Sequence, residues 1–252
     1  MLDLDGTLYT SSGPIPGAAE ALARLRQEQI PFRLVTNTTS RSRALLVQRL
    51  AGYGLKVSAG EVFTATLAGA QVAKRAGYRV VAPFVPEPAL ADMAGLELCG
   101  GTSGHPRRTA EAVLMGDLGE KWSYALLQEA FEHMMSGAAL IALSRDRYWL
   151  RDGRLVLDAG PFVAGLEFAV GKEALLAGKP SAAFYTAALQ SMGLDPRKSV
   201  AMVGDDLWSD VQGAQRAGLM GWLVRTGKYR EAALAESGIV PDQILESVAA
   251  LG

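Results

Sequence analysis

The stretch Asp3-Leu4-Asp5-Gly6-Thr7-Leu8 places two carboxylates at the end of an expected buried strand, and the rest of the sequence is interpreted from it. Residues two apart on a strand point to the same face, so Asp3 and Asp5 can serve one site, while Gly6 allows a sharp turn. Ligands of open α/β sheets bind at this end of the strands. A nucleophilic carboxylate with a second one for proton transfer suits cleavage of a phosphate ester. Alone, the motif is equally typical of a polar turn.

Two further motifs carry groups that bind phosphate. Thr36 and Asn37 end an apolar run, and both can donate hydrogen bonds to phosphate oxygens, although both residue types are also common in turns and helix caps. Lys179 precedes Pro180 at an expected helix start, where it can neutralise a nucleophilic carboxylate and an incoming phosphate. A lone lysine is more often a solvated surface residue, so neither motif decides the function by itself.

The segment Val203-Gly204-Asp205-Asp206, with Asp210 shortly after it, concentrates carboxylates behind another apolar strand. Such a concentration of negative charge is costly unless a cation binds. Mg²⁺ commonly takes one or two carboxylates together with water and substrate phosphate, so we expect Asp205 to share Mg²⁺ with Asp3. Asp206 and Asp210 could instead be solvated residues near a helix N-terminus, where negative charge is favourable.

The composition argues against a nucleic-acid or membrane partner. The 252 residues include 25 Lys and Arg against 26 Asp and Glu, so no net field favours a polyanion or an anionic membrane surface. No apolar run approaches the ~20 residues of a membrane-spanning helix, and no signal-peptide pattern opens the chain. The only cysteine, Cys99, excludes an internal disulfide and suits a reducing compartment. We therefore expect a cytoplasmic protein.

Apolar periodicity predicts an α/β fold. Short apolar runs alternate with amphipathic helical patterns in the first and last thirds, which is typical of a parallel sheet wrapped by helices. The middle block restarts this alternation but lacks the carboxylate motifs, so we expect an inserted α/β cap domain. The predicted domains are 1–76 and 179–252 for a Rossmann-like, doubly wound core and 77–178 for the cap. Predicted helices cover 18–28, 40–50, 67–76, 89–93, 124–135, 182–192 and 210–217, and predicted strands cover 32–35, 79–85, 112–115, 139–143, 199–203 and 221–224.

The four motifs in this order resemble the haloacid dehalogenase superfamily, whose signatures are Asp-x-Asp-Gly-Thr, a Thr or Ser after the second strand, a Lys, and Gly-Asp-Asp with a further Asp. The resemblance spans nearly the whole chain. The run from Thr36 to Arg43 is similar to the nitrophenyl-phosphatase-like subfamily, which carries a large α/β (C2-type) cap. Segments 116–118, 124–135, 147–149, 158–162 and 225–230 resemble the branch that contains phospholysine phosphohistidine inorganic pyrophosphate phosphatase and related hydrolase-domain proteins.

The resemblance implies a role for each motif residue. Asp3 would be the nucleophile and a Mg²⁺ ligand, Asp5 the general acid and base that also offers its backbone carbonyl to the metal, and Asp205 the remaining carboxylate ligand. Residues that would hold the phosphoryl group are Leu4, Thr36, Asn37 and Lys179. Asp206 and Asp210 would be supporting residues, Asp210 by contacting Lys179 or a metal-bound water.

These roles predict a magnesium-dependent phosphatase that acts on a small phosphate ester, a phosphoramide or pyrophosphate through an aspartyl-phosphate intermediate, with a homodimer through the cap as a possibility. A phosphomutase would use the same motifs. Only Met1 and Leu2 precede Asp3, whereas family members have several apolar strand residues there, so we expect a truncated first strand that loses most of its sheet hydrogen bonds. A catalytically silent protein that binds Mg²⁺ or phosphate is therefore a second alternative.

Overall fold

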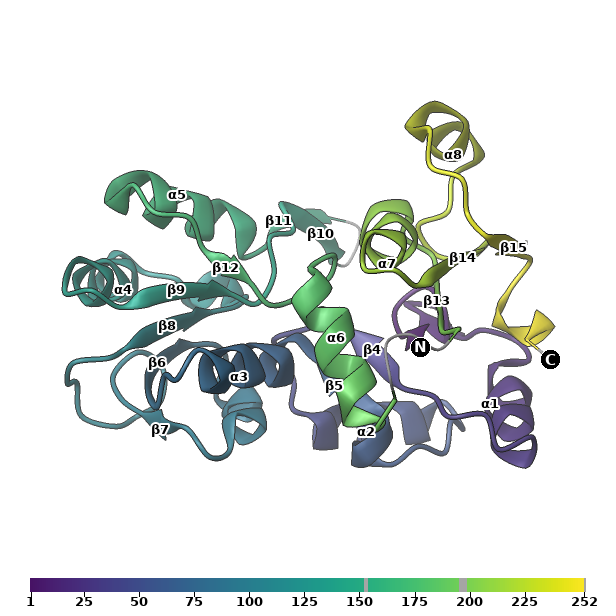
Figure 1. The fold of residues 1–252 in the computed structure, drawn as a ribbon, viewed down its shortest axis with the longest axis horizontal. Helices are drawn as coiled ribbons and strands as arrows, with labels where there is room; N and C mark the ends of the chain where they lie inside the picture. Colours follow the sequence, from purple (N-terminus) through teal and green to yellow (C-terminus); the bar gives the residue numbers. More distant parts are fainter. Residues whose placement is uncertain (152–153, 195–198, 252) are drawn as a thin grey trace. The chain divides into compact units, whose positions relative to one another are not determined.

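The computed structural model describes residues 1–151, 154–194 and 199–251, and the chain forms two compact units. Unit 1 comprises Met1–Thr36, Ala44–Phe63 and Lys179–Gly252, and unit 2 comprises Asn37–Arg43 and Thr64–Gly178 (Figure 1). The change of unit after Gly178 coincides with a predicted domain boundary. The change after Phe63 comes earlier than the predicted boundary after residue 76, because the helix that follows Phe63 packs its small residues into the core of unit 2.

Unit 1 is built on a parallel sheet. Among the described residues it has six strands in the order β15-β14-β13-β1-β4-β5. Their bounds are β1 Leu2–Asp3, β4 Leu34–Thr36, β5 Val62–Thr64, β13 Ala201–Gly204, β14 Met220–Val224 and β15 Gln243–Leu245. The chain builds outward from β1 to β4 and β5, and then returns to the other side of β1 with β13. This reversal creates a topological switch point beside β1, which is where doubly wound sheets bind their ligands.

The central strand β1 is short but is paired on both sides. Leu2 is aligned with Leu34 of β4 and with Val203 of β13. Leu2 N–H donates to Arg33 O at 2.8 Å, and Met1 O accepts from Val203 N–H at 2.9 Å. The α-amino group of Met1 donates to a β13 carbonyl at 2.6 Å, and burial lowers the pKa of this amino group to about 5. The strand is thus brief, as predicted, but it keeps hydrogen bonds to both neighbours.

Helices and turns complete unit 1. They are α1 Ala18–Gln27, α2 Arg43–Gly52, η1 Ala59–Glu61, α6 Ala182–Ser191, η4 Leu207–Gln212, α7 Gly213–Arg216, α8 Glu231–Ser237 and η5 Val248–Ala250, with a small hairpin of β2 Tyr9–Thr10 and β3 Gly13–Pro14. Leu22 of α1 and Leu46 and Leu50 of α2 pack against Leu2 and Leu34 of the sheet in one buried cluster. Burial of these apolar side chains therefore holds β1 and β4 in place.

Unit 2 has its own parallel sheet, in which the described strands follow the order β12-β9-β8-β6-β7. Their bounds are β6 Val80–Phe84, β7 Glu97–Leu98, β8 Ala112–Met115, β9 Ala139–Ala142 and β12 Leu175–Leu176. Successive strand residues enter opposite cores: Val113 and Met115 pack on one face, whereas Ala112 and Leu114 pack on the other. Strands that are buried on both faces explain the continuous apolar runs in this part of the sequence.

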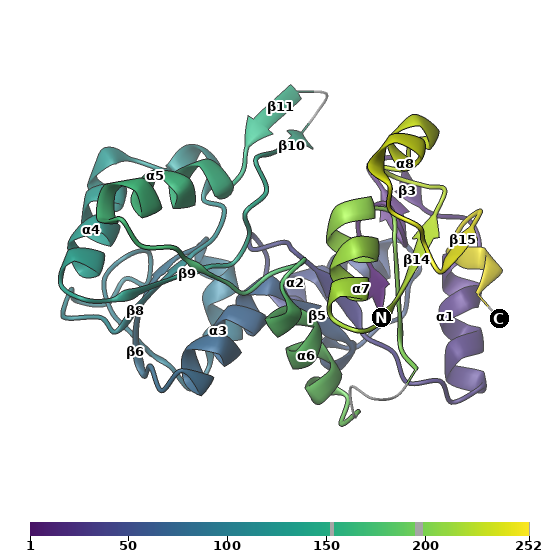
Figure 2. The same ribbon diagram turned by 45° about the horizontal axis from the view of Figure 1, so that its top comes forward.

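Helices cover both faces of the sheet of unit 2 (Figure 1). Helix α3 (Ala65–Arg75) and the turn η2 (Glu87–Met93) lie on one face, and α4 (Tyr124–Met135) and α5 (Gly160–Val170) lie on the other. A hairpin of β10 (Tyr148–Arg151) and β11 (Arg154–Leu157) projects away from the sheet (Figure 2), and η3 (Gly119–Lys121) precedes α4. No described helix is both long and apolar enough to cross a membrane.

The predicted elements agree with the structure where the apolar pattern is long. Strand β8 and helix α4 have the predicted bounds. The prediction missed α8 and the strands β5, β7, β12 and β15, which are two or three residues each. It also missed α5, whose apolar character is nearly continuous and gives no clear period. The helix expected at 210–217 instead starts at Leu207 with a π-helical turn. That difference bears directly on the site.

A pair of adjacent leucines on α2 tests this packing. Leu46 is 1% exposed in the core of unit 1, whereas its neighbour Leu45 is 39% exposed. We expect Leu46→Ala to lower the free energy of unfolding by about 2–5 kcal/mol because it leaves a cavity, and Leu45→Ala to lower it by about 1 kcal/mol or less. Urea denaturation of both variants measures the difference, and equal losses would contradict the assigned inner face of α2.

Candidate active site

Three acidic side chains and one lysine of unit 1 come together at the carboxyl ends of β1 and β13. Lys179 Nζ donates to Asp3 Oδ1 and to Asp210 Oδ1, the latter at 2.7 Å. Side-chain oxygens of Asp3, Asp205 and Asp210 lie within 4.8 Å of one another, and we call these residues the carboxylate cluster. All four side chains are buried. The fold thus gathers residues from three distant parts of the chain.

Sheet register and helix capping bring these residues together. Leu2 is aligned with Val203, so Asp3 and Asp205 follow the ends of neighbouring parallel strands. Lys179 lies just before α6, whose first turn is capped by Ser181 Oγ accepting from Phe184 N–H at 3.2 Å. The lysine is therefore delivered by a rigid helix start and not by a flexible surface loop.

Asp210 reaches the cluster from the widened turn η4. Asp206 caps this turn, because its Oδ1 accepts from the amides of Trp208 and Ser209 at 3.0 Å each. Asp210 Oδ2 in turn accepts from Asp206 N–H at 3.2 Å, while its Oδ1 pairs with Lys179. For both aspartates a solvated position near a helix N-terminus was the alternative; Asp206 caps the start of η4, whereas Asp210 lies inside the cluster. π-helical turns often occur at functional sites.

A loop after β14 fixes Asp205 from the other side. Lys228 N–H donates to Asp205 Oδ2 at 2.6 Å, and Thr226 Oγ1 donates to Gly6 O at 2.5 Å. A Cβ on Gly227 would lie 2.0 Å from Asp205 Oδ2 and 2.5 Å from Gly6 Cα. In the sequence analysis, segment 225–230 indicated only a family branch and received no role. A glycine such as Gly227 can indicate a close approach of two chain segments, but only the folded chain shows that it approaches Asp205 and Gly6.

The cluster carries an imbalance of buried charge. Burial raises the pKa of Asp3 and of Asp210, against the opposing effect of the Lys179 charge. Burial and the neighbouring Asp210 raise the pKa of Asp205 to about 7. Burial alone would lower the pKa of Lys179, but the charges of Asp210 and Asp3 hold it well above its usual value. One cation faces three carboxylates, so without a further cation the cluster retains a proton near neutral pH.

Asp5 lies in a different environment from Asp3. Its side chain is exposed, and its Oδ2 accepts a hydrogen bond of 3.0 Å from the hydroxyl of Tyr9. Burial raises the pKa of Tyr9 well above its usual value, and the charge of Asp5 acts in the same direction, so the hydroxyl remains a donor. The motif therefore supplies one buried carboxylate beside a lysine and one solvent-accessible carboxylate.

The predicted phosphate-binding residues fall in both units. Thr36 ends β4 and is buried, and it follows Val35, which is aligned with Asp3 of β1. The side chain of Leu4 lies in the core of unit 1, so only its backbone could contact a ligand. Asn37 belongs to unit 2, where a Cβ on Gly178 would lie 2.9 Å from its Oδ1. The fold thus groups Thr36 and Leu4 with the strand of Asp3, whereas Asn37 is part of the other unit.

The carboxylate cluster has the donor set of a divalent-cation site. Hard cations such as Mg²⁺ and Ca²⁺ bind carboxylate oxygens, and the cluster holds more negative charge than Lys179 can neutralise. Among the described residues, the cluster includes the side chain of Asp210 and not that of Asp5. A metal contact through the backbone carbonyl of Asp5 is what the family resemblance implies.

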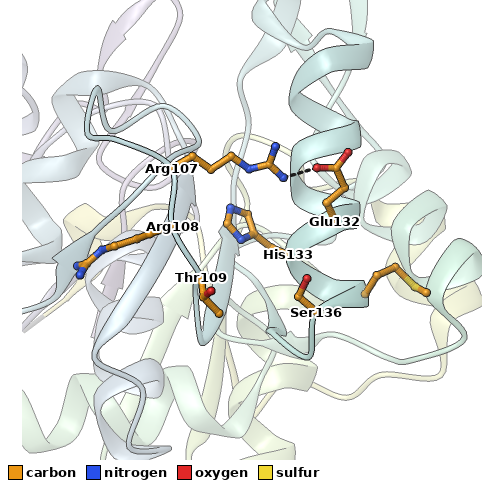
Figure 3. A pocket seen from close by; sticks show the side chains of 7 residues that line it. Arg107, Arg108, Thr109, Glu132, His133 and Ser136 are labelled. Carbon is orange, nitrogen blue, oxygen red and sulfur yellow. Dashed lines mark hydrogen bonds and ion pairs between the residues drawn. The ribbon is translucent and has the colours of Figure 1, made fainter.

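A pocket in unit 2 differs in its chemistry. It is lined by Arg107, Arg108, Thr109, Glu132, His133, Met135 and Ser136 (Figure 3). Both arginines form ion pairs with glutamates, so their charge is already balanced. His133 is buried, and its Nε2 lies 3.6 Å from Glu129 Oε1, beyond hydrogen-bond distance. This pocket lacks the combination of carboxylates and lysine found in unit 1.

Comparisons with known proteins point to one family. A family model described as haloacid dehalogenase-like hydrolase matches residues 1–98, and one described as HAD-hydrolase-like matches residues 176–251. Human haloacid dehalogenase-like hydrolase domain-containing protein 2 is 40% identical over 91% of this chain and 85% of its own length. Human phospholysine phosphohistidine inorganic pyrophosphate phosphatase is 36% identical over 91% of this chain and 83% of its own length.

Solved structures give the same picture. A p-nitrophenyl phosphatase from Archaeoglobus fulgidus has a TM-score of 0.88 and 28% identity, covering 99% of this chain and 95% of its own. A glycerol phosphate phosphatase from Mycobacterium tuberculosis, solved in complex with magnesium, has a TM-score of 0.85 and 28% identity, covering 100% of this chain and 75% of its own. These likenesses confirm the predicted α/β fold class.

The charge imbalance predicts an unusual pH dependence of stability. The folded-state pKa of Asp205, about 7, lies above its ordinary value of 3.8, so the folded protein binds an extra proton between these values. The contribution of Asp205 to stability is therefore fully present below about pH 3.8 and is lost as pH rises through about 7. Calorimetry with a chelator present should show a Tm that falls between about pH 4.5 and pH 7 and then levels off. Asp205→Asn should flatten this slope, whereas the surface variant Asp242→Asn should retain it.

Alanine substitutions at two glycines with similar backbone angles distinguish the cost of backbone strain from the effect of displacing the Asp205 side chain. Gly227 has a φ of 58° and faces Asp205, whereas Gly238 has a φ of 68° and nothing within 4 Å of an added Cβ. Alanine at either position should cost about 1–2 kcal/mol of backbone strain. Only Gly227→Ala should also reduce the rise in Tm that Mg²⁺ produces, measured by thermal melting. An equal response to Mg²⁺ in both variants would contradict the positioning of Asp205 by this loop.

Proposed function

This chain belongs to the haloacid dehalogenase-like hydrolases, as its motifs indicated, and we propose that it is a magnesium-dependent phosphatase that works through an aspartyl-phosphate intermediate. The observation that carries the proposal is the buried contact of Lys179 with Asp3, beside Asp205 and Asp210. A nucleophile that must approach a phosphate dianion needs its own charge reduced, and a buried lysine at this position meets that need.

In the first half of the proposed reaction, a carboxylate oxygen of Asp3 attacks phosphorus. A bond forms between that oxygen and phosphorus, and the bond from phosphorus to the leaving atom breaks, which is oxygen in an ester or pyrophosphate and nitrogen in a phosphoramide. Asp5 gives its proton to that leaving atom, so the leaving group departs as an alcohol, phosphate or an amine according to the substrate. The exposure of Asp5 fits protonation of the leaving group, because the leaving group would lie on the solvent side of the site.

In the second half, water attacks the phosphorus of the acyl phosphate on Asp3. Asp5, now ionised, takes a proton from that water, and the bond between Asp3 and phosphorus breaks to release inorganic phosphate. Asp3 regains its carboxylate and Asp5 regains its proton, so the cycle closes. One residue thus serves as acid and then as base, which requires a carboxylate that can reach both the leaving group and the attacking water.

The remaining residues would bind and neutralise. Asp3 and Asp205, with the backbone carbonyl of Asp5, would hold Mg²⁺, which when bound offsets negative charge on the nucleophile and the phosphoryl group. Lys179 would share that charge, held in place by Asp210. Thr36, Asn37 and the backbone of Leu4 would donate to phosphoryl oxygens, and Asp206 would support the site by fixing the start of η4.

We propose a small substrate: a phosphate monoester, a phosphoramide or pyrophosphate. The relatives described above support this class, because their names refer to p-nitrophenyl phosphate, glycerol phosphate, phospholysine, phosphohistidine and inorganic pyrophosphate. Inorganic phosphate as product would distinguish the hydrolase from a phosphomutase, which would return an isomerised ester. A cytoplasmic location and a homodimer through the cap remain predictions from the sequence.

Phosphate release from p-nitrophenyl phosphate tests the proposal. We expect turnover that requires Mg²⁺, is lost with a chelator and returns when Mg²⁺ is restored. Asp3→Asn should lower kcat by roughly a thousandfold or more, because it removes the nucleophile, and Asp5→Asn by roughly a hundredfold or more. Acid quenching followed by mass spectrometry should detect a phosphoryl group on Asp3 of the wild-type protein.

Folded but inactive wild-type protein at all Mg²⁺ concentrations would overturn the proposal and favour the silent binding protein. Asp242→Asn serves as the matched control, because among the described residues its side chain accepts from Gln215 of α7 and Gly221 of β14 and is not part of the carboxylate cluster. It should keep wild-type turnover. Activity that survives Asp3→Asn would exclude Asp3 as the nucleophile.

A further inference from the structure

The second aspartate of the motif has a buried partner that the proposed reaction does not yet use. Tyr9 is 1% exposed, and its hydroxyl donates to Asp5 Oδ2 at 3.0 Å. Among the described residues, this hydroxyl is the side-chain partner recorded for the Asp5 carboxylate. A buried donor and an exposed acceptor therefore meet at the edge of the core.

The backbone fixes this pair in a tight loop. Leu4 O accepts from Leu8 N–H at 2.9 Å, and Gly6 N–H donates to Tyr9 O at 2.7 Å. Asp5 and Tyr9 also form an isolated β-bridge. These bonds close the chain on itself between the two residues, so the backbone of Tyr9 cannot move away from Asp5 without breaking the turn that carries the motif.

The ring of Tyr9 is held from two further sides. The guanidinium of Arg49, on α2, lies 4.7 Å from the ring centroid. The ring of Tyr53 lies 5.3 Å away, centroid to centroid, and is tilted by 37°. Cation–π and ring contacts of this kind favour one orientation of the tyrosine. The hydroxyl is thus a rigid donor, aimed from the core at an otherwise solvent-exposed carboxylate.

We propose that Tyr9 is a positioning residue for proton transfer: by occupying Oδ2 of Asp5, it directs the exchangeable proton to Oδ1 and restricts the carboxyl group to the orientation that reaches the leaving group and the attacking water. The proposal rests on the proposed function of Asp5 as general acid and base. Tyr9 itself gives up no proton. Arg49 acts one step further back, by holding the ring of Tyr9.

This role has a consequence that a purely structural tyrosine would not have. A leaving group that is stable as an anion needs little protonation, whereas a poor leaving group depends on the acid. A loosely held Asp5 should therefore slow the cleavage of a poor leaving group more than that of a good one. p-Nitrophenyl phosphate and phenyl phosphate provide such a pair, because their rings are similar in shape and their leaving groups differ in basicity.

The experiment compares kcat/KM of the wild-type protein and Tyr9→Phe on these two substrates. Phenylalanine keeps the ring and its contacts with Arg49 and Tyr53 and removes only the hydroxyl. We expect the loss on phenyl phosphate to exceed the loss on p-nitrophenyl phosphate by roughly tenfold, since positioned general acids contribute about 10²–10⁴-fold. With p-nitrophenyl phosphate, whose cleavage depends least on the acid, acid quenching should also show more phosphoenzyme at steady state in Tyr9→Phe, because Asp5 assists its hydrolysis as a base.

A double-mutant cycle separates this role from a general effect on folding. In the Asp5→Asn background, Tyr9→Phe should cause no further change in the ratio of the two substrates, because no proton is left to position. Tyr78→Phe is the matched control, since it also removes one tyrosine hydroxyl but from a side chain that packs against the core of unit 2. It should leave the substrate ratio at the wild-type value. Thermal melts check that each variant is folded.

Equal losses on both substrates in Tyr9→Phe, or the same ratio change in the Asp5→Asn background, would overturn the role of Tyr9 while leaving the phosphatase intact. No loss on either substrate would overturn it as well. A wild-type protein that releases phosphate from neither substrate would instead overturn the proposed function, and the role of Tyr9 with it.

Discussion

The buried lysine between two aspartates is the interaction on which the site depends. Lys179 contacts Asp3 and Asp210, and Asp205 lies within 4.8 Å of both carboxylates. A buried charge is tolerated only when it is paired, and a single lysine cannot neutralise three carboxylates. The protein therefore holds a site that is incomplete in charge, and a cation or a retained proton must balance it. Such an imbalance costs stability, which is a common feature of sites built for ligands.

Sheet topology explains how these charges can be assembled. The chain reverses its direction of growth at β1, so the ends of β1 and β13 are neighbours although about two hundred residues separate them. Neither strand could carry the site alone. Because parallel strands end at the same edge, the aspartates that follow them share one environment, and Lys179 can reach that edge from the start of α6.

Backbone turns fix the positions of the acidic side chains more closely than charge pairing alone would. Gly6 and Gly227 approach so closely that a methyl group on the latter would lie 2.5 Å from Gly6 Cα, and the amide of Lys228 holds Asp205. On the opposite side of the motif, Tyr9 anchors Asp5 to the core. The two aspartates of one short motif thus have different surroundings: Asp3 is buried and paired with Lys179, and Asp5 is exposed and accepts a hydrogen bond from Tyr9. This difference suits a nucleophile and a proton-transfer group.

The sequence by itself determined the order of the motifs, the α/β class and elements such as α4 and β8, because these depend on local periodicity and on residues close together in the chain. Only the tertiary structure decided the partners. Asp206 and Asp210 look alike in sequence, but the π-helical turn sends Asp210 to Lys179 and leaves Asp206 as a cap paired with Lys228. The roles of Tyr9 and Gly227 were likewise hidden, because each depends on contacts and distances that exist only once the chain is folded.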